Sequence, residues 1–386
     1  MAFEVTVDVL RRLLWARGVP TVATDDELIE ASRDAKHKLG ITLLSAFAAA
    51  GRTLTPAQET ELGHHRERIE RYRTAWKEVH AVAPGAYRVK GDEIAQYYPE
   101  GVLRPSSDLD VVIRDPAQLW AAAHRAIELG WEIGALTVVE NRDGGDPDIL
   151  IEAQIRGDEE IFGIYYGVEL RTVDIPTSTR QPAYRVPDPY GSPLAVNTIA
   201  LLAERWERDF TSRDRLDLAL MVDRFTEADQ TALVAALNET DMWPEWHELS
   251  REIGRVGWLP HLPILREAAQ QHQRPTRARR LVHSVRLWGH PLRAMAYLAQ
   301  ATVDADRGPL ADRLAAFVGK HVGARRVFGL GVPVFGVPLP DPPGGPPDKL
   351  SLVRRGRHLV AESPVGEFLL VTSSCQQEWI EEAQAR

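Results

Sequence analysis

The sequence predicts an α/β (α+β) protein: a small mixed sheet preceded by a helical N-terminal layer and followed by a mostly helical region. Three observations favour this class. Apolar residues recur at helical spacing before residue 80, short runs suited to strands fall between 87 and 174, and Trp and Leu positions typical of helices recur after 226. The expected parts are a helical layer (1–84), the sheet-containing core (85–225), a helical C-terminal domain (226–339), and a Pro/Gly linker with a small β/α tail (340–386).

The N-terminal layer is expected to hold three helices. The first carries Val7 and Leu14 on one face, and a longer one runs from about 25 to 50 and ends at Gly51, a natural helix C-cap. The third begins at Thr55-Pro56-Ala57-Gln58, where Thr and Gln form a capping box and Pro occupies the first turn.

In the core, Asp115-Pro116-Ala117-Gln118 is a second capping box, opening a helix that stops at Gly130. A strand is expected over 131–140. The segment 148–156 alternates apolar and polar residues, which places Glu152 on the polar face of a half-buried strand.

Composition narrows the function classes. The length of 386 residues allows two or three domains, and the net charge of -9 argues against broad nucleic-acid binding. Cys375 is the single cysteine, so an intramolecular disulfide and a Cys-based zinc site are excluded, which fits a reducing cytoplasm. No apolar run reaches the roughly 20 residues of a membrane span, and no signal-peptide pattern opens the chain. We expect a cytoplasmic protein.

The chemistry of the chain is predicted to centre on Asp108 and Asp110. They fall in a short strand after the turn Arg104-Pro105-Ser106-Ser107, and alternation sends both carboxylates to one face. Two neighbouring carboxylates disfavour each other's ionisation, and a divalent cation removes that conflict. Hard oxygen ligands at this spacing suit Mg²⁺, with substrate phosphates as further ligands. The alternative is a solvated strand start.

The order of motifs around this pair carries a resemblance. Lys90-Gly91, then Tyr98-Pro99, then Arg104, then Ser107-Asp108-Leu109-Asp110 followed by apolar residues resembles a bacterial family of nucleotidyltransferases in the polymerase-beta-like superfamily. The similarity runs from about 85 to 225. It implies a small mixed-sheet catalytic core, Mg²⁺ (or Mn²⁺) as the metal, and a nucleoside triphosphate as co-substrate.

Two-metal phosphoryl transfer also needs a third carboxylate, which binds metal or takes a proton. The family pattern has a carboxylate two residues before a His in an apolar strand. Glu152 matches that position, although Gln154 stands where the His is expected. Asp174 and then Glu169 are the alternatives. The expected catalytic and metal-binding residues are therefore Asp108, Asp110 and Glu152.

Several residues are expected to bind the nucleotide. Ser106 and Ser107 stand where relatives carry Gly-Ser and grip the terminal phosphates. Lys90, with Gly91, and Arg104 are counter-charges for phosphate oxygens, surface charge being the alternative. Arg213 and Asp214 open a helix that resembles the one framing the nucleotide pocket in the family, although ion pairs among 213–217 are an equal reading.

The rest of the chain offers no independent chemistry. The basic cluster 274–280 indicates either phosphate or RNA contact or a solvated helix start, and 329–336 is expected to be a loop. Strands are expected over 350–372, with a hairpin at Arg354 to His358, and a last helix carries Cys375 and Trp379.

The resemblance implies an ATP-binding, Mg²⁺-dependent transferase that moves a nucleoside monophosphate to a hydroxyl or carboxylate of a small molecule. AMP is the leading candidate for the nucleotide that is transferred. Pyrophosphate is released. No nucleic-acid or membrane partner is expected. Two alternatives stay open: transfer to protein or tRNA, and a nucleotide-binding or regulatory module of the same fold that has lost catalysis.

Overall fold

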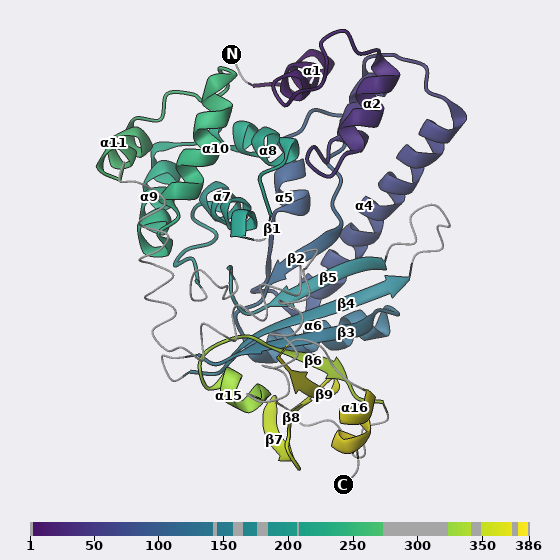
Figure 1. Ribbon diagram of the computed structural model, residues 1–386, viewed down its shortest axis with the longest axis vertical. Helices are drawn as coiled ribbons and strands as arrows, with labels where there is room; N and C mark the ends of the chain where they lie inside the picture. The colour runs from purple at the N-terminus through teal and green to yellow at the C-terminus, as the bar shows by residue number, and fades with distance from the viewer. Residues whose placement is uncertain are drawn as a thin grey trace, which may run out of the picture. The chain divides into compact units, whose positions relative to one another are not determined.

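The computed structural model describes residues 3–141, 145–156, 165–175, 184–206, 208–272, 323–340, 349–372 and 377–384. The predicted mixed α/β class is confirmed (Figure 1). The chain forms two compact units, and each is assembled from three segments. The first holds Met1–Arg73, Arg88–Ser107 and Val186–Thr276; the second holds Thr74–Tyr87, Asp108–Arg185 and Arg277–Arg386. The four-part division expected from the sequence stays a prediction.

The first unit is helical. Its helices are α1 (Val7–Trp15), α2 (Asp25–Arg33), α3 (Gly40–Ala49), most of α4 (Pro56–Val82), α5 (Gly91–Ala95), α7 (Pro193–Ala203), α8 (Ser212–Val222), α9 (Glu227–Thr240), α10 (Trp243–Arg255) and α11 (Pro263–Gln271). A short 3₁₀ helix, Glu204–Trp206, follows α7. Leucines such as Leu10, Leu43 and Leu218 are fully buried together with Trp243, so the apolar stripes of these helices form the core.

The single helix expected over 25–50 is wrong, because a loop at 34–39 separates α2 from α3. Asp34 leaves the helical region at φ -50° and ψ 140°. The carbonyls of Lys36 and His37 then accept hydrogen bonds from the backbone N–H groups of Ser212 (3.1 Å) and Arg213 (3.0 Å) in the first turn of α8. These N–H groups have no partner within their own helix. A long-range contact therefore interrupts the helix, which local periodicity cannot reveal.

The predicted helix caps are mostly confirmed. Gly51 follows α3 at φ +84°, and Thr55 and Gln58 exchange hydrogen bonds at the start of α4. The second capping box is incomplete. Asp115 caps α6 (Pro116–Glu128) by accepting from the Ala117 N–H, but Gln118 contacts the Asp115 side chain and accepts from the Gly85 N–H instead. Gln118 thus joins the end of the α4 segment to α6.

A nine-stranded mixed sheet dominates the second unit, with β1 at the point where the chain passes between units. The strands are β1 (Tyr87–Val89), β2 (Asp108–Val112), β3 (Glu132–Val139), β4 (Asp148–Arg156), β5 (Tyr165–Arg171), β6 (Val334–Pro338), β7 (Ser351–Arg355), β8 (His358–Ser363) and β9 (Gly366–Val371). Their order is β1-β2-β5-β4-β3-β6-β9-β8-β7. The β2–β5 pair is parallel. The six neighbouring pairs in the order β5-β4-β3-β6-β9-β8-β7 are all antiparallel.

The two faces of the inner strands differ. Leu109, Val111, Ile151 and Leu170 are buried on one face, and α6 packs against β3, β4 and β5 (Figure 1). The alternation predicted for 148–156 is confirmed, since the Glu152 side chain on the opposite face is exposed. The polar face of these strands is therefore the one that carries the predicted acidic residues.

The loop expected at 329–336 is wrong in its second half, because β6 begins at Val334. This strand pairs with β3 through Leu136 opposite Gly336 and Thr137 opposite Phe335. A Cβ atom on Gly336 would lie 2.8 Å from the Phe368 Cβ and 3.0 Å from the Leu136 carbonyl oxygen. Only glycine allows this close approach of strands, so this position reflects packing and not a phosphate loop.

The strands expected over 350–372 are confirmed as β7, β8 and β9, with the hairpin turn at Gly356 (φ +57°). The short helix α15 (Ala324–Phe328) precedes β6, and the last helix, α16 (Gln377–Gln384), carries Trp379 as expected. A small apolar cluster joins α16 to the outer strands: Leu339, Val360, Leu369, Val371 and Ala383. The basic cluster 274–280 and Cys375 lie outside the described residues.

Candidate functional site

Three carboxylates form a row across the polar face of the sheet. Asp110 on β2 lies directly opposite Glu169 on β5, and Glu169 lies directly opposite Glu152 on β4. Residues opposite each other in register point to the same face. Asp108 precedes Asp110 by two residues and shares that face, with Gly167 as its partner on β5. The sheet thus brings the predicted Asp pair and two of the three candidate third carboxylates together.

Register also ranks the third-carboxylate candidates. Adjacent strands lie about 4.8 Å apart, so Glu169 is one strand from Asp110 and Glu152 is two strands away, about 10 Å. Two ligands of one Mg²⁺ must place oxygens about 2.1 Å from the ion. Glu169 meets that requirement more readily than Glu152, although the sequence ranked it last.

Asp174 belongs to a different cluster. Its buried carboxylate accepts hydrogen bonds from the Tyr87 hydroxyl and from Arg114 Nη2, the second at 3.0 Å. Burial, reinforced by the adjacent carboxylate, raises the pKa of Tyr87, so the phenol stays protonated and donates. These contacts give Asp174 a structural role in the second unit.

Arg171 lies among the carboxylates of the row. Its Nη1 atom is 2.7 Å from Glu169 Oε1 and 3.8 Å from Asp110 Oδ1, and its side chain is 5% exposed. Burial alone lowers the pKa of Arg171, but Glu169 and Asp110 outweigh that effect and raise the pKa. A permanently charged guanidinium therefore neutralises the acidic row in this structure.

Glu152 has a distinct environment at the end of the row. Its side chain is solvent-exposed, yet nearby protein atoms remove enough water to raise the pKa of its carboxyl above the ordinary value. A carboxylate whose pKa moves toward neutrality is a better proton acceptor for general-base catalysis.

The donor set of the acidic row suits Mg²⁺, because all of its acidic oxygens are hard carboxylate ligands. In this structure the described residues contain no group of three or more His, Cys, Asp or Glu side chains already positioned as metal ligands. The contact of Arg171 with Glu169 and Asp110 is consistent with that, since a cation already lies between these two carboxylates.

The predicted nucleotide-binding residues belong to the first unit. Arg104 is fully engaged there. Its Nε and Nη2 atoms donate to both oxygens of Asp217 at 2.8–3.1 Å, and the Tyr98 hydroxyl donates to the same carboxylate at 2.6 Å. Burial by itself lowers the pKa of Arg104, but Asp217 raises it above its ordinary value. Arg104 Nη1 also donates to the Gly91 carbonyl at 3.3 Å, so Arg104 connects to the Lys90–Gly91 segment that was also predicted to bind the nucleotide.

Lys90 is the N-cap residue of α5, which begins at Gly91. Lys90 has φ +57° and ψ -135°, a conformation that favours glycine, and strain of this kind costs about 1–3 kcal/mol. Its backbone N–H donates to Asn197 Oδ1 at 2.5 Å, and its ammonium contacts Glu204 at 2.7 Å. The ammonium predicted to meet phosphate therefore contacts a carboxylate here.

Arg213 contacts the chain just before Ser106 and Ser107. Arg213 Nη1 donates to the Pro105 carbonyl at 3.0 Å, and the Tyr72 hydroxyl donates to the Ser107 carbonyl at 2.5 Å. These bonds hold the turn that leads into Asp108.

Asp214 instead has a capping role. It completes the capping box of α8 with Thr211 and pairs with Arg208 at 2.6 Å. Burial would raise the pKa of Asp214, but the hydrogen bond and charge of Arg208, the charge of Arg213 and the Thr211 N–H together outweigh burial and lower it. The ion pairs expected within the segment 213–217 are wrong in their partners, because Asp214 pairs with Arg208 and Asp217 with Arg104, both outside that segment.

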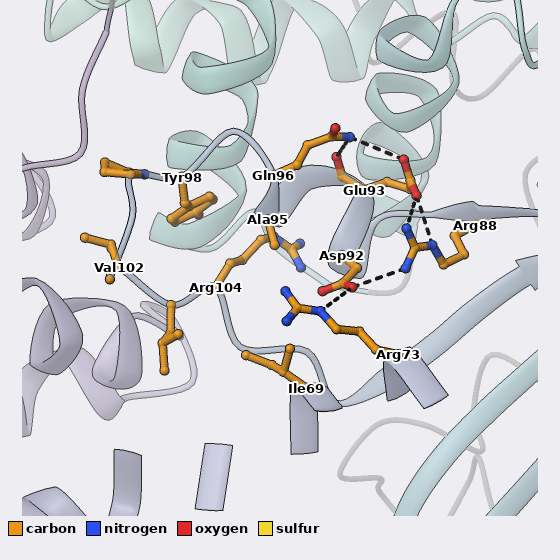
Figure 2. Close-up of a pocket in the computed structure, with 13 residues that line it drawn as sticks. Ile69, Arg73, Arg88, Asp92, Glu93, Ala95, Gln96, Tyr98, Val102 and Arg104 are labelled. Atoms are coloured by element: carbon orange, nitrogen blue, oxygen red, sulfur yellow. Dashed lines mark hydrogen bonds and ion pairs between the residues drawn. The ribbon is translucent and has the colours of Figure 1, made fainter. Parts of the chain in front are cut away.

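A pocket of about 360 Å³ lies within the first unit, between α4, α5 and the loop that follows α5 (Figure 2). Arg88 contacts Asp92 at 3.1 Å and Glu93 at 2.6 Å, and Arg73 contacts Asp92 at 3.3 Å. Each of these charged groups already has a partner of opposite sign. A charged ligand would have to break an ion pair to bind, so the network serves to fix α5.

Two contributors to these sites were not singled out by the sequence. Arg171 lies two residues after Glu169, so strand alternation alone places it on the acidic face, but a charge in a strand gives no sign of its partner. Asp217 was considered only for ion pairs within 213–217, although it is fully buried and pairs with Arg104. No helix among the described residues is long and apolar enough to cross a membrane.

Comparisons with family models, curated proteins and solved structures gave no significant match to this chain.

Proposed function

We propose that this chain is a Mg²⁺-dependent nucleotidyltransferase that moves a nucleoside monophosphate from a nucleoside triphosphate to a hydroxyl or carboxylate of a small molecule. AMP is the leading candidate for the nucleotide that is transferred. The proposal is supported chiefly by the acidic row: Asp110, Glu169 and Glu152 lie side by side on the sheet face opposite α6, with Asp108 on the same face. The motif order from Lys90 to Asp110 agrees with it.

The residues have separate roles in this proposal. Asp108, Asp110 and Glu169 would hold Mg²⁺, and the ion would supply positive charge to neutralise and orient the triphosphate. Glu152 takes the proton from the attacking hydroxyl, since its raised pKa suits a base. The acceptor oxygen attacks the α-phosphorus, the bond to the bridging oxygen breaks, and pyrophosphate leaves. Gly167 leaves the space beside Asp108 without a side chain.

The test is pyrophosphate release from ATP, GTP, CTP and UTP with Mg²⁺ and a panel of small hydroxyl and carboxylate acceptors. The double variant Asp108→Ala/Asp110→Ala is expected to lose turnover and keep its fold. A matched control, Asp8→Ala/Asp26→Ala, removes two exposed carboxylates from α1 and α2 and should retain turnover. Normal release by the first double variant would reject the proposed site.

One observation favours a second candidate, a nucleotide-binding or regulatory module that has lost catalysis. Arg171 already supplies a positive charge to Glu169 and Asp110, so the acidic row can be stable without a metal. Binding of a triphosphate with no pyrophosphate release across the acceptor panel, in wild type and in Arg171→Met alike, would support this candidate. Release by the wild type would exclude it.

The acceptor divides the enzymatic reading further. Transfer to a protein side chain or tRNA stays an alternative whose support is the basic cluster at 274–280. Changing Arg277, Arg279 and Arg280 to Ala should weaken use of such an acceptor and leave a small-molecule acceptor unaffected. An unchanged rate with a macromolecular acceptor would remove that alternative.

A further inference from the structure

The loop that separates α2 from α3 holds Lys38 in a fixed position. Lys38 has φ +52°, and its backbone N–H donates to the Asp34 carbonyl at 3.0 Å. The preceding residue, His37, is fully buried, accepts from the Arg213 N–H through its carbonyl, and contacts the Ser212 hydroxyl through Nδ1 at 2.7 Å. Lys38 is therefore fixed next to the start of α8.

Lys38 is half-buried, and two other cations, Arg208 and Arg213, act on its ammonium. Burial lowers the pKa of Lys38, and repulsion from Arg208 and Arg213 lowers it further; the attraction of Asp214 and Glu204 offsets only part of this effect. Those two carboxylates are already engaged with Arg208, at 2.6 Å and 2.9 Å. Among the residues that the structure describes, the Lys38 ammonium makes no hydrogen bond and no ion pair.

A half-buried cation beside other cations is costly unless an anion neutralises it. Arg213, one of these cations, also contacts a turn that is suited to receive an anion. Arg213 Nη1 holds the Pro105 carbonyl at 3.0 Å, so Ser106 and Ser107 follow directly after the point that Arg213 contacts. Hydroxyl groups, a guanidinium and an ammonium are the groups that commonly bind phosphate oxygens.

We infer that Lys38 binds a phosphate oxygen of the nucleoside triphosphate, together with Arg213 and the Ser106–Ser107 turn. This assignment rests on the proposed function, because it takes the ligand to be the same triphosphate. A triphosphate is favoured over a single carboxylate since it offers several charged oxygens to several cations at once. The flexible four-carbon stem of Lys38 lets its ammonium reach an oxygen without movement of the loop.

The test measures binding of inorganic tripolyphosphate and of ATP, each with Mg²⁺, by titration calorimetry. Lys38→Gly removes the ammonium and relieves the positive φ, so the variant is expected to fold at least as well as wild type. Its affinity for both probes should fall about tenfold, which corresponds to about 1.4 kcal/mol. Lys38→Arg keeps the charge and should retain most of the affinity.

Lys36→Gln is the matched control. Lys36 lies in the same loop, but its ammonium is exposed and sits 3.5 Å from Asp34. It should bind both probes as wild type does.

The outcomes separate this inference from the proposed function. Equal affinity of Lys38→Gly and wild type, or a wild type that binds neither probe, overturns the assignment of Lys38. Pyrophosphate release with normal KM for the triphosphate in Lys38→Gly also overturns it, while the proposed function stands. Conversely, Lys38-dependent binding without any pyrophosphate release upholds the assignment and rejects the transferase function.

Discussion

Replacing Arg171 with Met is the sharpest perturbation of the acidic row, because it removes the cation that contacts both Glu169 and Asp110. The Arg171 and Asp110 side chains are 5% and 7% exposed, and that of Glu169 is 26% exposed. Breaking a buried ion pair by removing one partner typically costs 3–5 kcal/mol, and the partial exposure of Glu169 places this case near about 3 kcal/mol. We expect the variant to be less stable by that amount without Mg²⁺.

The same substitution should strengthen metal binding. If Mg²⁺ must displace a guanidinium held by about 3 kcal/mol, its affinity in wild type is reduced by roughly 100-fold. For a variant that binds Mg²⁺ with a dissociation constant of about 1 mM, adding 10 mM Mg²⁺ stabilises the fold by about 1.4 kcal/mol. The corresponding gain in wild type should be less than about 0.1 kcal/mol, which thermal unfolding with and without MgCl₂ would measure.

Arg125→Met is the control for loss of charge. Arg125 belongs to the same unit and pairs with Glu78 and Glu128, but all three side chains are at least 35% exposed. Exposed pairs contribute little, about 1 kcal/mol or less, so this variant should be nearly as stable as wild type and indifferent to Mg²⁺. Equal Mg²⁺ responses in Arg171→Met and wild type would refute the idea that the guanidinium competes with a metal.

Three further outcomes are expected. Arg104→Ala should destabilise the protein by about 3–5 kcal/mol in urea unfolding, because it leaves the fully buried Asp217 carboxylate without its ion-pair partner. The double variant Arg104→Met/Asp217→Leu should recover much of that loss, and no recovery would contradict the reasoning. Glu152→Gln should raise the melting temperature at pH 7 but not at pH 3.5. Because the pKa of Glu152 is raised in the folded state, its contribution to stability is present at low pH and is lost as the pH rises through that pKa and the carboxyl ionises. Gln carries no charge at either pH, so it relieves a cost that exists only at pH 7. Tyr87→Phe should cost about 1.5–3 kcal/mol through the lost hydrogen bond to Asp174, and a thermal shift no larger than that of a surface substitution would show the bond to be unimportant.

Local patterns predicted much of the fold. The caps at Gly51 and Thr55 and the alternation around Glu152 are properties of neighbouring residues, and the structure bears them out. The break at 34–39 and the strand at 334–338 were missed because both depend on distant partners. One is held by the start of α8 and the other by β3.

The candidate site was predicted unevenly for the same reason. That Asp108 and Asp110 share a face follows from two-residue alternation alone. The neighbour of Asp110 could not be read from the sequence, since the order β2-β5-β4 places Glu169 before Glu152 and reverses the ranking. Nor could the sequence show that Arg104 is held by Asp217, because 113 residues separate them.

The pairing of β3 with β6 has a practical consequence for work on fragments of this chain. A fragment restricted to 85–225 would lack β6 and leave the N–H and C=O groups of β3 around Leu136 to Val138 without their sheet partner. Unpaired strand edges recruit other chains and promote aggregation. Fragments meant for crystallisation or assay should therefore retain 334–371, which caps that edge with four further strands.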